Sequence, residues 1–600
     1  MIILLLPNML QSKTLITSIQ EVLFRVRFLK PLLICLCLIA FLGVSSVTSA
    51  ATFSHTQESI LYVKPGATGN CGSWVDACNL QTALTKAMAG DQIWVTAGTY
   101  KPTTITDRAA NFQLITGVAI YGGFAGTETN LAERDWVNNI TTLSGDIGIP
   151  DDKTDNSYHV VIGSGVNFSA ILDGFTITAG YATPYSSHPN GGGMYIDSGS
   201  PTLKNITFLD NLAMMGGAIS NNNGDPLVEN VSFLDNSASL YGGGIYNTGN
   251  SHPTFVEVVF STNTAEYSGG GMYNTMNSSP TLSKVTFNNN TAVYYGGGIT
   301  NHGSGRSTLT DVTFSGNSAP RGGGIYNYFV NSILTNVTFS GNYASEDGGG
   351  IFNNNSNIKL VNSTLSGNSA VLRGGGIHNY ASSPTLTNVT LFGNSAAEGA
   401  GIHNRGSSNP NITNAILWGN TPDQILDSSS TTTINYSVIQ GSHTGTGNID
   451  QDPLLGPLAD NGGFTKTQAL DAGSPAIDTG SNTVCLVVDQ RGYMRPVDGN
   501  GDTTAICDMG AYEYASSLAT FSLSAEINGG GSVTKNPDKP SYQFGDVVTL
   551  TAIPDPVWSF SYWGGDIFAT KNPLIVIIPG NISTTAVFFQ INNFLPLISR

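Results

Sequence analysis

The stretch GGGIYNYFVNSILTNVTFSGN, residues 322–342, decides the fold because versions of it recur along much of the chain. Within it, Ile325 alternates with Tyr326, and Val337 alternates with Thr338. Alternation with a period of two is typical of short β-strands that bury one face. No part of the stretch has the spacing of an amphipathic helix. The repeating unit is therefore built from strands and turns.

Two motifs define the repeat, which returns roughly every 25 to 27 residues, a period typical of solenoids and propellers. A Gly-rich tripeptide followed by an apolar residue begins at Gly191, Gly216, Gly242, Gly269, Gly296, Gly322, Gly348, Gly374 and Gly399. The second motif, of the type NVTFSGN, begins at Asn205, Asn230, Asp311, Asn336 and Asn388. A propeller blade needs about 40 to 45 residues, and leucine-rich, ankyrin and tetratricopeptide repeats need a helix or their own leucine frame. The unit therefore predicts one coil of a parallel β-helix, with Ile, Val and Phe stacked inside.

The composition agrees with this fold. The chain has 600 residues, of which 71 are Gly and only 11% are charged. Stacked coils need apolar residues inside and a permissive backbone at tight corners. The net charge of −17 disfavours nucleic acid and anionic membranes as partners, because binding to phosphate needs clustered Lys and Arg. The hydrophobic share of 40% also excludes a solvated acidic tail.

The first 50 residues have the organisation of a secretory signal peptide. Basic residues up to Lys30 precede an uncharged apolar stretch, residues 31–47, which ends in Thr48, Ser49 and Ala50. A positive region, a short apolar region and a small-residue cleavage site predict export with cleavage after Ala50. The alternative is an uncleaved membrane anchor, since about 17 apolar residues are at the lower limit for spanning a bilayer. We expect cleavage, and hence no integral membrane span in the mature chain.

Four cysteines remain after removal of the signal, and they form two local groups. Of the three possible connectivities, the simplest joins Cys71 to Cys78 and Cys485 to Cys507. Local disulfides suit an oxidising, extracytoplasmic compartment. No Cys-x-x-Cys or His-Glu-x-x-His spacing indicates zinc.

The repeat motifs resemble those of the polymorphic outer-membrane proteins and, more widely, of right-handed β-helix surface proteins. Four further stretches resemble the bacterial choice-of-anchor β-helix family: GDQIWVTAGTY (90–100), FQLITGVAIYGGFAGTET (112–129), SPAIDTG (474–480) and CDMGAYEY (507–514). The resemblance covers residues 54–515. It implies an all-β fold, a right-handed parallel β-helix or solenoid, on a secreted or cell-surface bacterial protein. It implies little about activity.

Residues 519–590 leave the repeat and resemble the divergent internalin-type B-repeat, a small β module of bacterial surface proteins. The stretches GDVVTLTAIPD (545–555) and TTAVFFQ (584–590) carry its alternating pattern. We expect its core to consist of Trp558, Phe560, Trp563 and Phe588.

We therefore expect six segments along the chain. They are a signal peptide (1–50), an N-terminal cap with irregular coils (51–190), regular β-helix repeats (191–420), the C-terminal end of the β-helix with the choice-of-anchor-like segment (421–517), the B-repeat-like module (519–590) and a tail (591–600).

The cap is predicted to contain a helix over residues 79–90, because Asn79 is a good N-cap and a Gly follows the last turn. Its apolar face would consist of Leu80, Leu84, Ala87 and Met88. Such a helix would cover the open end of the core, where unpaired strand edges invite aggregation.

Asn recurs at two positions of each coil, so that stacking the coils places these residues in two columns. One column runs from Asn221 to Asn404 and the other from Asn211 to Asn420. We expect their side chains to bond to one another along the coil axis and to turn backbone groups. The alternative is a ladder that binds ice or glycans.

A third column, next to the buried Ile, points outward and carries aromatic residues. Its candidate ligand-binding members are Tyr246, Tyr273, Tyr326 and Phe352. Aromatic faces bind sugar rings, but stacking among themselves also stabilises a sheet by roughly 0.2 to 1 kcal/mol per pair.

Charged residues of alternating sign stand directly before the Gly-rich motif in successive coils. The candidates for chemistry in this region are Glu346, Asp347, Arg373, His378 and His403. Inverting glycoside hydrolysis needs two carboxyl groups about 6.5 to 9.5 Å apart, which next-but-one coils could supply. The alternative, which we favour, is a surface ion-pair ladder.

One loop outside the repeat has the alternating oxygen ligands of a calcium site. Asp498, Asn500 and Asp502 stand at alternate positions, as in calcium loops. The loop lacks the Gly and Glu that complete the EF-hand pattern. The alternative is an Asp/Gly turn held by the Cys485–Cys507 disulfide. Calcium is the one cofactor for which the sequence offers a candidate site.

These observations favour a secreted or surface-displayed, adhesin-like structural protein that is not catalytic and whose ligand is a polysaccharide or another cell-surface group. The competing hypothesis is a polysaccharide lyase or glycoside hydrolase. Enzymes on this fold need long loops that wall a groove, whereas the coils of residues 191–420 differ by only a residue or two. The irregular coils between Tyr121 and Pro189 could still supply such a wall.

Overall fold

A computed structural model describes residues 59–183, 188–515, 520–543, 545–578 and 580–590 of the chain. The predicted signal peptide, residues 1–50, and the predicted tail, residues 591–600, lie outside the described residues. Among the described residues, no helix has the length and apolarity needed to cross a membrane.

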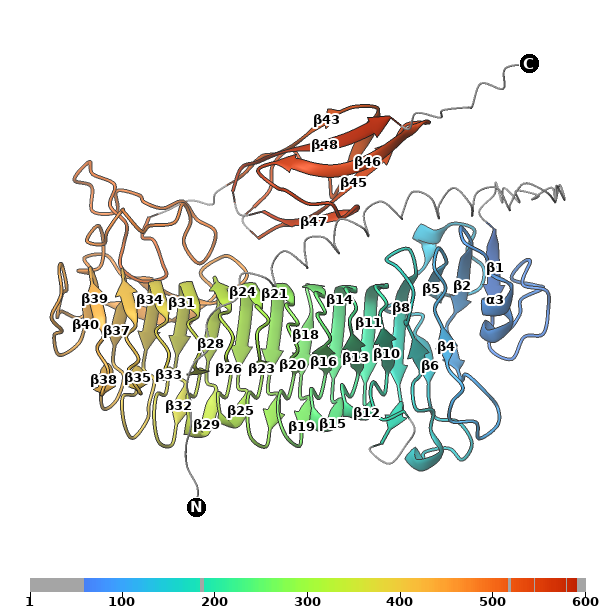
Figure 1. Cartoon of the computed structure of the whole chain (residues 1–600), viewed down its shortest axis with the longest axis horizontal. Helices are drawn as coiled ribbons and strands as arrows, with labels where there is room; N and C mark the ends of the chain where they lie inside the picture. Colours follow the sequence, from blue (N-terminus) through green and yellow to red (C-terminus); the bar gives the residue numbers. More distant parts are fainter. Residues whose placement is uncertain (1–58, 184–187, 516–519, 544, 579, 591–600) are drawn as a thin grey trace, which may run out of the picture. The chain divides into compact units, whose positions relative to one another are not determined.

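The described part of the solenoid consists of three parallel β-sheets, to which each regular coil contributes in turn (Figure 1). Sheet B has 12 strands: β4 (Phe112–Gln113), β7 (Val161–Ile162), β10 (Met194–Asp197), β13 (Ile219–Asn222), β16 (Ile245–Thr248), β20 (Met272–Asn274), β23 (Ile299–His302), β26 (Ile325–Tyr328), β30 (Ile351–Asn354), β33 (Ile377–Tyr380), β35 (Ile402–Arg405) and β38 (Ile425–Ser428). Sheet C has eight strands: β9 (Tyr181–Ala182), β12 (Leu212–Met215), β15 (Ser237–Tyr241), β19 (Thr264–Ala265), β22 (Thr291–Ala292), β25 (Ser318–Arg321), β29 (Tyr343–Asp347) and β32 (Ser369–Ala370).

Sheet A is the largest, because most coils add to it either one long strand or two short ones separated by a bend. Its 20 strands are β1 (Ile60–Val63), β2 (Gln92–Thr96), β3 (Gly98–Tyr100), β5 (Ala119–Phe124), β6 (Thr141–Ser144), β8 (Ile171–Thr178), β11 (Thr202–Leu209), β14 (Leu227–Leu234), β17 (Thr254–Val256), β18 (Val259–Ser261), β21 (Thr281–Asn288), β24 (Thr308–Ser315), β27 (Ile333–Thr335), β28 (Thr338–Ser340), β31 (Lys359–Ser366), β34 (Thr385–Phe392), β36 (Asn411–Thr413), β37 (Ile416–Trp418), β39 (Thr433–Asn435) and β40 (Val438–Ile439). The predicted parallel β-helix is confirmed.

The core of the solenoid is a stack of equivalent apolar side chains. Residues of the second repeat motif form a ladder of fully buried rings whose neighbouring planes lie within 9° of parallel; its members are Phe208, Phe233, Phe260, Phe287, Phe314 and Phe339. Ring centres of neighbours such as Phe260 and Phe287 lie 4.6 Å apart. Each ring therefore stays out of water and gains a stacking partner in the next coil.

The Gly-rich motif forms the tight corner between sheet C and sheet B. Gly322 has a φ of +69°, which disfavours a side chain. A Cβ placed on Gly323 would come within 2.4 Å of the carbonyl oxygen of Tyr343 in the next coil. The corner needs Gly because neighbouring coils approach here backbone to backbone.

The two predicted Asn columns form hydrogen-bonded ladders inside the coil corners. In the first, Asn327 Nδ2 donates to Asn353 Oδ1 at 3.0 Å, and the pattern continues along the column. In the second, Asn317 Nδ2 donates to Asn342 Oδ1 at 3.0 Å and to Phe287 O at 2.9 Å. These four Asn side chains are fully buried. The structural interpretation of the Asn columns is confirmed, since buried amides cannot contact an external ligand.

The capping helix is shorter than the sequence predicted. Helix α3 (Leu80–Lys86) begins where expected, with Asn79 Oδ1 accepting a bond from Thr82 N, but it ends four residues before Gly90. Ala87 is already extended, and Met88 is 55% exposed rather than part of the buried face. Asp91 explains the early end, because its Oδ2 accepts a bond from Met88 N and draws the chain into a turn.

After β40 the chain leaves the coil path and folds back over the outer face of sheet A. The segment contains the antiparallel strands β41 (Leu455–Ala459) and β42 (Thr467–Leu470). Asn362 Nδ2 donates to Val488 O at 2.8 Å, and Thr364 Oγ1 donates to Gln490 Oε1 at 2.7 Å. Both predicted disulfides, Cys71–Cys78 and Cys485–Cys507, are present.

The C-terminal module, described by itself, consists of two three-stranded sheets. Its strands are β43 (Leu523–Asn528), β44 (Gly531–Asn536), β45 (Val547–Pro554), β46 (Trp558–Gly565), β47 (Leu574–Ile577) and β48 (Ile582–Gln590). Trp563 and Phe588 are buried, and Trp558 and Phe560 pack against the same core as partly buried residues. All four predicted aromatic residues therefore belong to this core.

Candidate functional site

A row of large side chains follows the corner where each coil passes from sheet C to the Gly-rich turn. The backbone positions directly before the turn pair from coil to coil, as Tyr241 with Ser268 and Arg373 with Glu398. The first half of the row is aromatic and the second half is charged.

The aromatic half, called the tyrosine cluster below, joins residues of the corner to the outward column of sheet B. Its members are Tyr241, Tyr246, Tyr267, Tyr273, Tyr294, Tyr295 and Tyr326. The rings of Tyr267 and Tyr294 lie 4.8 Å apart and are 38% and 48% exposed. Two neighbouring coils therefore present adjacent aromatic rings to solvent.

The predicted ligand-binding column is less exposed than the sequence suggested. Tyr273, Tyr326 and Phe352 point away from the core, but they are only 8%, 7% and 6% exposed. The physical reason is that residues of the corner cover them; for example, Tyr241 lies 4.6 Å from Tyr273 between ring centres. This burial raises the pKa of Tyr326 to about 12. Tyr246 is half-buried. Tyr246 and Tyr273 therefore pack against Tyr241, whereas Phe352 packs against Tyr326 and His378.

The charged half, called the charged row below, is a chain of ion pairs. Arg321 Nε lies 2.7 Å from Glu346 Oε2 and 3.9 Å from Asp347 Oδ2. Arg373 lies 3.8 Å from Asp347 and 3.5 Å from Glu398. Every carboxylate of the row therefore faces a guanidinium of a neighbouring coil, as the alternating signs predicted.

The environment of Asp347 shifts its protonation. Its side chain is 8% exposed, and burial raises its pKa. The two guanidinium groups of Arg373 and Arg321 oppose this shift. A carboxyl group with a raised pKa between two coils has one property of a general acid.

The predicted base candidates, His378 and His403, lie beneath the row. They are 2% and 1% exposed, and their rings stack with centres 5.0 Å apart. Burial lowers the pKa of His403, and burial with the nearby His403 and Arg373 lowers that of His378 further. The Nδ1 atoms of both rings lack a hydrogen-bond partner within the described residues. Neither imidazole reaches the surface where a substrate would lie.

The calcium candidate forms a turn whose oxygens are already engaged. Asp498 accepts bonds from the backbone amides of Gly501 and Thr503, both at 2.7 Å, and Asn500 Oδ1 accepts one from Asp502 N at 2.8 Å. Within the described residues, no group of three or more His, Cys, Asp or Glu side chains is placed to hold a metal ion. Calcium binding here stays a prediction, which unchanged melting on addition of EGTA would oppose.

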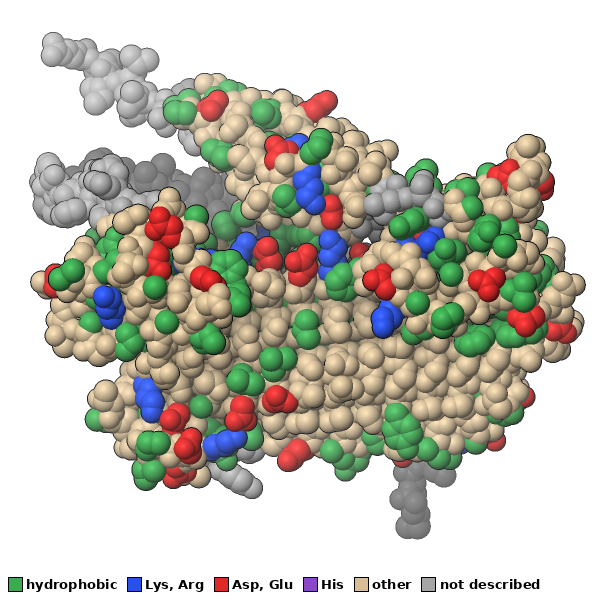
Figure 2. Space-filling view, turned by 180° about the vertical axis from the view of Figure 1, so that it is seen from behind, with side chains coloured by type: hydrophobic (Ala, Val, Ile, Leu, Met, Phe, Trp, Pro, Cys, Tyr) green, Lys and Arg blue, Asp and Glu red, His purple; other side chains and the backbone are tan. Residues whose placement is uncertain are grey.

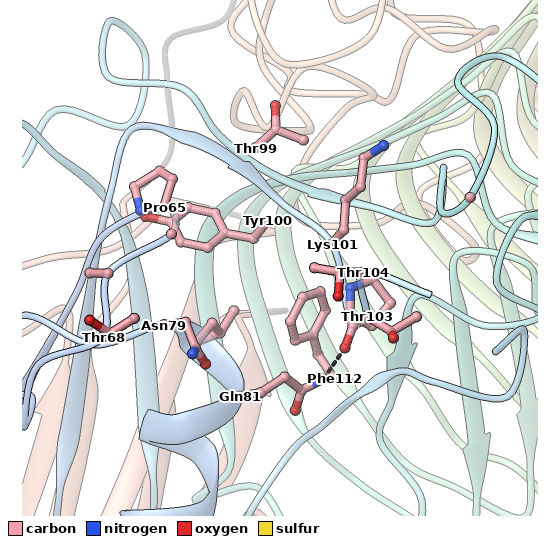
Figure 3. A pocket seen from close by; sticks show the side chains of 15 residues that line it. Pro65, Thr68, Asn79, Gln81, Thr99, Tyr100, Lys101, Thr103, Thr104 and Phe112 are labelled. Carbon is pink, nitrogen blue, oxygen red and sulfur yellow. Dashed lines mark hydrogen bonds between the residues drawn. The ribbon is translucent and has the colours of Figure 1, made fainter. Parts of the chain in front are cut away.

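A pocket of about 650 Å³ opens between the capping helix and the loop that follows β3 (Figure 3). Tyr100, Phe112 and Pro65 form part of its wall. Two of its polar side chains bond to the protein: Tyr100 Oη donates to Thr96 O at 3.0 Å, and Gln81 Nε2 donates to Pro102 O at 3.1 Å. The hydroxyl groups of Thr68, Thr99 and Thr104 also line the pocket and have no hydrogen bond to another described residue.

Sequence reasoning missed the exposed members of the tyrosine cluster. Tyr267 and Tyr294 each stand two positions before the first Gly of the corner, outside the column that the alternation singled out. Their equivalent in the preceding coil is Leu240, which is also exposed. The repeated position was visible in the sequence, but the identity of its residues changes from coil to coil.

Comparison with protein-family models supports the fold. Residues 154–319 match a model described as right handed beta helix region. Residues 311–328 and 336–354 match the Chlamydia polymorphic membrane protein repeat, and residues 521–592 match the divergent InlB B-repeat domain. A comparison with curated proteins finds no match.

Two solved structures are similar to part of the chain. Pectate lyase Pel9A is 14% identical, with a TM-score of 0.34, and the match covers 76% of this chain and 97% of that one. The catalytic unit of the GH87 alpha-1,3-glucanase of Streptomyces thermodiastaticus strain HF3-3 is 12% identical, with a TM-score of 0.34, and the match covers 65% and 69%. Likeness at this level carries no argument about activity.

Proposed function

We propose that this protein is an exported, adhesin-like solenoid that binds neutral polysaccharide along the tyrosine cluster and does not cleave it. The observation that carries the proposal is the adjacent exposure of Tyr267 and Tyr294 on neighbouring coils. Aromatic rings with an apolar face and a polar hydroxyl are suited to the mixed surface of a sugar ring.

The base beneath these two rings supports the proposal. Tyr241 contacts Tyr267 at 5.3 Å and Tyr273 at 4.6 Å between ring centres, so the exposed rings rest on others. Rings held in this way lose little conformational freedom on binding, which lowers the entropic cost of association.

Charge favours a neutral ligand over an acidic one. The net charge of −17 repels polyanions. The guanidinium groups of Arg321 and Arg373 are already paired with carboxylates, so they offer no free cation to a uronic acid. On the face shown in Figure 2, charged side chains gather in separate groups and uncharged atoms cover most of the area between them.

The geometry of the charged row supports a role without catalysis. The two histidines are buried, and the carboxylates pair with arginines of adjacent coils. The corner segments before the Gly-rich turns, such as Asn290–Gly296 and Asn317–Gly322, differ by one residue in length. No long loop rises beside the row in this region to exclude water from a reaction.

Export is supported by two independent features. The two disulfides, at 71–78 and 485–507, are of the kind that persists outside the cytoplasm. The polymorphic membrane protein repeats and the divergent B-repeat module are both matched in this chain. Attachment to a cell surface is part of the proposal.

Affinity electrophoresis of the full chain in gels that contain laminarin, xyloglucan or polygalacturonate tests the proposal. We expect retardation by at least one neutral polymer. Replacing both rings, Tyr267→Ala with Tyr294→Ala, should weaken that binding about tenfold, since each ring contributes roughly 0.5 to 1.5 kcal/mol. The control is Tyr380→Ala, which removes a ring that is 42% exposed at another position of sheet B. Equal retardation of the double variant and the wild type would refute the proposal.

The enzymatic alternative rests on Asp347, whose raised pKa and pairing with two arginines give it one feature of an acid catalyst. The test is release of reducing ends or unsaturated products from the same polymers. Release by the wild type that is lost in the Glu346→Ala and Asp347→Ala variants would favour a hydrolase or lyase. Absence of release favours the binding protein.

A further inference from the structure

An uncharged groove lies on the outer face of sheet A, where an irregular loop rises beside three regular strands. The loop connects β5 with β6 and contains the short 3-10 helix η1 (Leu131–Glu133). Trp136 and the exposed Val137 and Ile140 come from this loop. The floor comes from β8, β11 and β14, which are neighbouring strands of the sheet (Figure 1). The groove has a volume of about 290 Å³.

The wall of the groove is a tryptophan held by an arginine. The guanidinium carbon of Arg134 lies 4.8 Å from the ring centre of Trp136. Arg134 is itself fixed, because its Nη2 donates to Asp173 Oδ2 at 2.7 Å and its Nη1 donates to Asp173 O at 3.2 Å. The arginine side chain is 8% exposed, whereas the indole is 38% exposed. The ring is therefore supported from behind and open to solvent in front.

The floor of the groove presents a row of free hydroxyl groups. Thr176, Thr207 and Ser232 are in register on three adjacent strands, as the pairs Thr207 with Thr176 and Thr207 with Ser232 show. Neighbouring strands lie about 4.8 Å apart, so the hydroxyls repeat at that spacing. All three residues are partly exposed, and none of their hydroxyl groups has a hydrogen bond to another described residue.

Two amides lie beside this row and complete the polar floor. Asn205 Nδ2 donates to Asp173 Oδ1 at 2.7 Å, and Asn230 Nδ2 donates to Asn205 Oδ1 at 2.6 Å. This chain fixes the orientation of both amides and leaves the exposed Asn230 Oδ1 as an acceptor. Every residue that lines the groove is uncharged.

This combination selects one ligand chemistry. An exposed indole offers a face for an apolar surface, and a row of hydroxyls offers donors and acceptors to a polyhydroxylated molecule. The absence of charge among the lining residues gives nothing to offset the desolvation of a carboxylate or phosphate. The volume is at the lower end of the range of about 300 to 1,000 Å³ for small-ligand pockets.

We propose that this groove is a binding site for a short neutral oligosaccharide, with one sugar ring stacked on Trp136 and its hydroxyl groups bonded to Thr176, Thr207 and Ser232. The site is separate from the tyrosine cluster and does not depend on it.

The test uses the full chain with its six tryptophans replaced by 5-fluorotryptophan, observed by fluorine NMR. The resonance of Trp136 is assigned from the Trp136→Phe variant. The probes are laminarihexaose and cellohexaose, with hexagalacturonate as the charged counterpart. We expect a neutral hexasaccharide to shift the Trp136 resonance and to leave the others in place. No tryptophan belongs to the tyrosine cluster, so this readout reports on the groove alone.

Affinity measured by isothermal titration completes the design. Trp136→Ala should weaken binding about tenfold, and Thr207→Val, which keeps the shape of the side chain, should weaken it about threefold. The control Tyr267→Ala with Tyr294→Ala should leave the Trp136 shift unchanged even where the proposed function fails. Should Trp136→Ala prove unstable, Thr207→Val still decides. The proposal is overturned if neither neutral probe shifts Trp136, if Thr207→Val binds as the wild type does, or if hexagalacturonate binds as tightly.

Discussion

Arg495 Nε donates to Glu513 Oε2 at 2.5 Å in a part of the chain where both side chains are fully enclosed. The pair belongs to a buried charged network in the segment that folds back over sheet A. Arg491 pairs there with Asp489 at 2.6 Å, and Asp508 N donates to Glu513 Oε2 at 3.1 Å. Buried charges of this kind hold a structure together only while every partner keeps its charge state.

This network predicts that the segment loses stability as the pH rises from about 4 to about 8. Burial, with the negative charge of Glu513, raises the pKa of Asp508 to about 8, whereas an unfolded Asp titrates near about 3.9. The stabilisation is therefore complete below about pH 4 and is lost as the pH rises through about 8. Hydrogen exchange of residues 478–514, corrected for intrinsic rates, should show more frequent opening at pH 9 than at pH 6. In Asp508→Asn this difference should shrink, and an unchanged difference would contradict the assignment.

The Cys485–Cys507 disulfide should contribute measurably to the same segment. It closes a loop with a sequence separation of 22, for which loop entropy predicts about 3 kcal/mol. Replacing both cysteines by Ser should make the local opening of residues 478–514 more favourable by that amount in hydrogen exchange. The matched control is the double Ser variant at Cys71 and Cys78, whose effect should be confined to the N-terminal cap. An effect of the first variant that spreads evenly over all coils would disagree with a local role.

The Asn ladders should be among the least replaceable features of the coils. Asn317 is fully buried, donates to Phe287 O and Asn342 Oδ1, and accepts from Asn290 N. Asn317→Ala leaves several buried polar groups unpaired, and we expect a loss of about 2 to 4 kcal/mol in the free energy of unfolding. Asn331→Ala is the control, because Asn331 is exposed and accepts a single bond. Similar urea midpoints for the two variants would count against the ladder as a source of stability.

The buried histidines predict that the protein is less stable in mild acid. Burial and the nearby His403, Arg373, Arg405 and Arg321 lower the pKa of His378, so the folded state holds it neutral. An unfolded His takes up a proton near about pH 6.5, and stability is therefore lost as the pH falls below that value.

The test is thermal unfolding at pH 7.5 and pH 5 of the wild type and His378→Phe. Phe is a conservative choice because Phe352 occupies the paired position in the preceding coil. The variant should lose less of its melting temperature between the two pH values. A loss equal to that of the wild type would show that His378 titrates normally in the folded chain.

The sequence predicted the architecture well because the repeat places the same requirement on every coil. Ile325 and Phe339 occupy positions that are buried in each coil, and Gly322 occupies a corner with positive φ. A prediction made for one coil therefore applies to the others, and an atypical residue in a single coil does not change the predicted fold. The capping helix occurs once. Its early end at Lys86 depends on a hydrogen bond to Asp91, and the spacing of apolar residues in a helix does not include such a bond.

The candidate binding surfaces were harder to predict because they depend on contacts between columns. Alternation correctly placed Tyr273 and Tyr326 outside the core, but it could not show that neighbouring side chains cover them. The groove at Trp136 depends on a loop from one coil that lies beside strands of the next ones. No periodic signal marks such a loop, and contacts such as the pairing of Arg134 with Asp173, 39 residues apart, fix its position.

Each bond of the Asn ladders joins one coil to the next, as Asn301 to Asn327 and Asn327 to Asn353. Because every coil supplies one donor to one neighbour and one acceptor to the other, a whole coil can be duplicated or deleted in a gene without orphaning an amide. The number of coils is thereby free to drift over evolutionary time. Selection can then change the length of the exposed surface independently of the side chains that the surface carries.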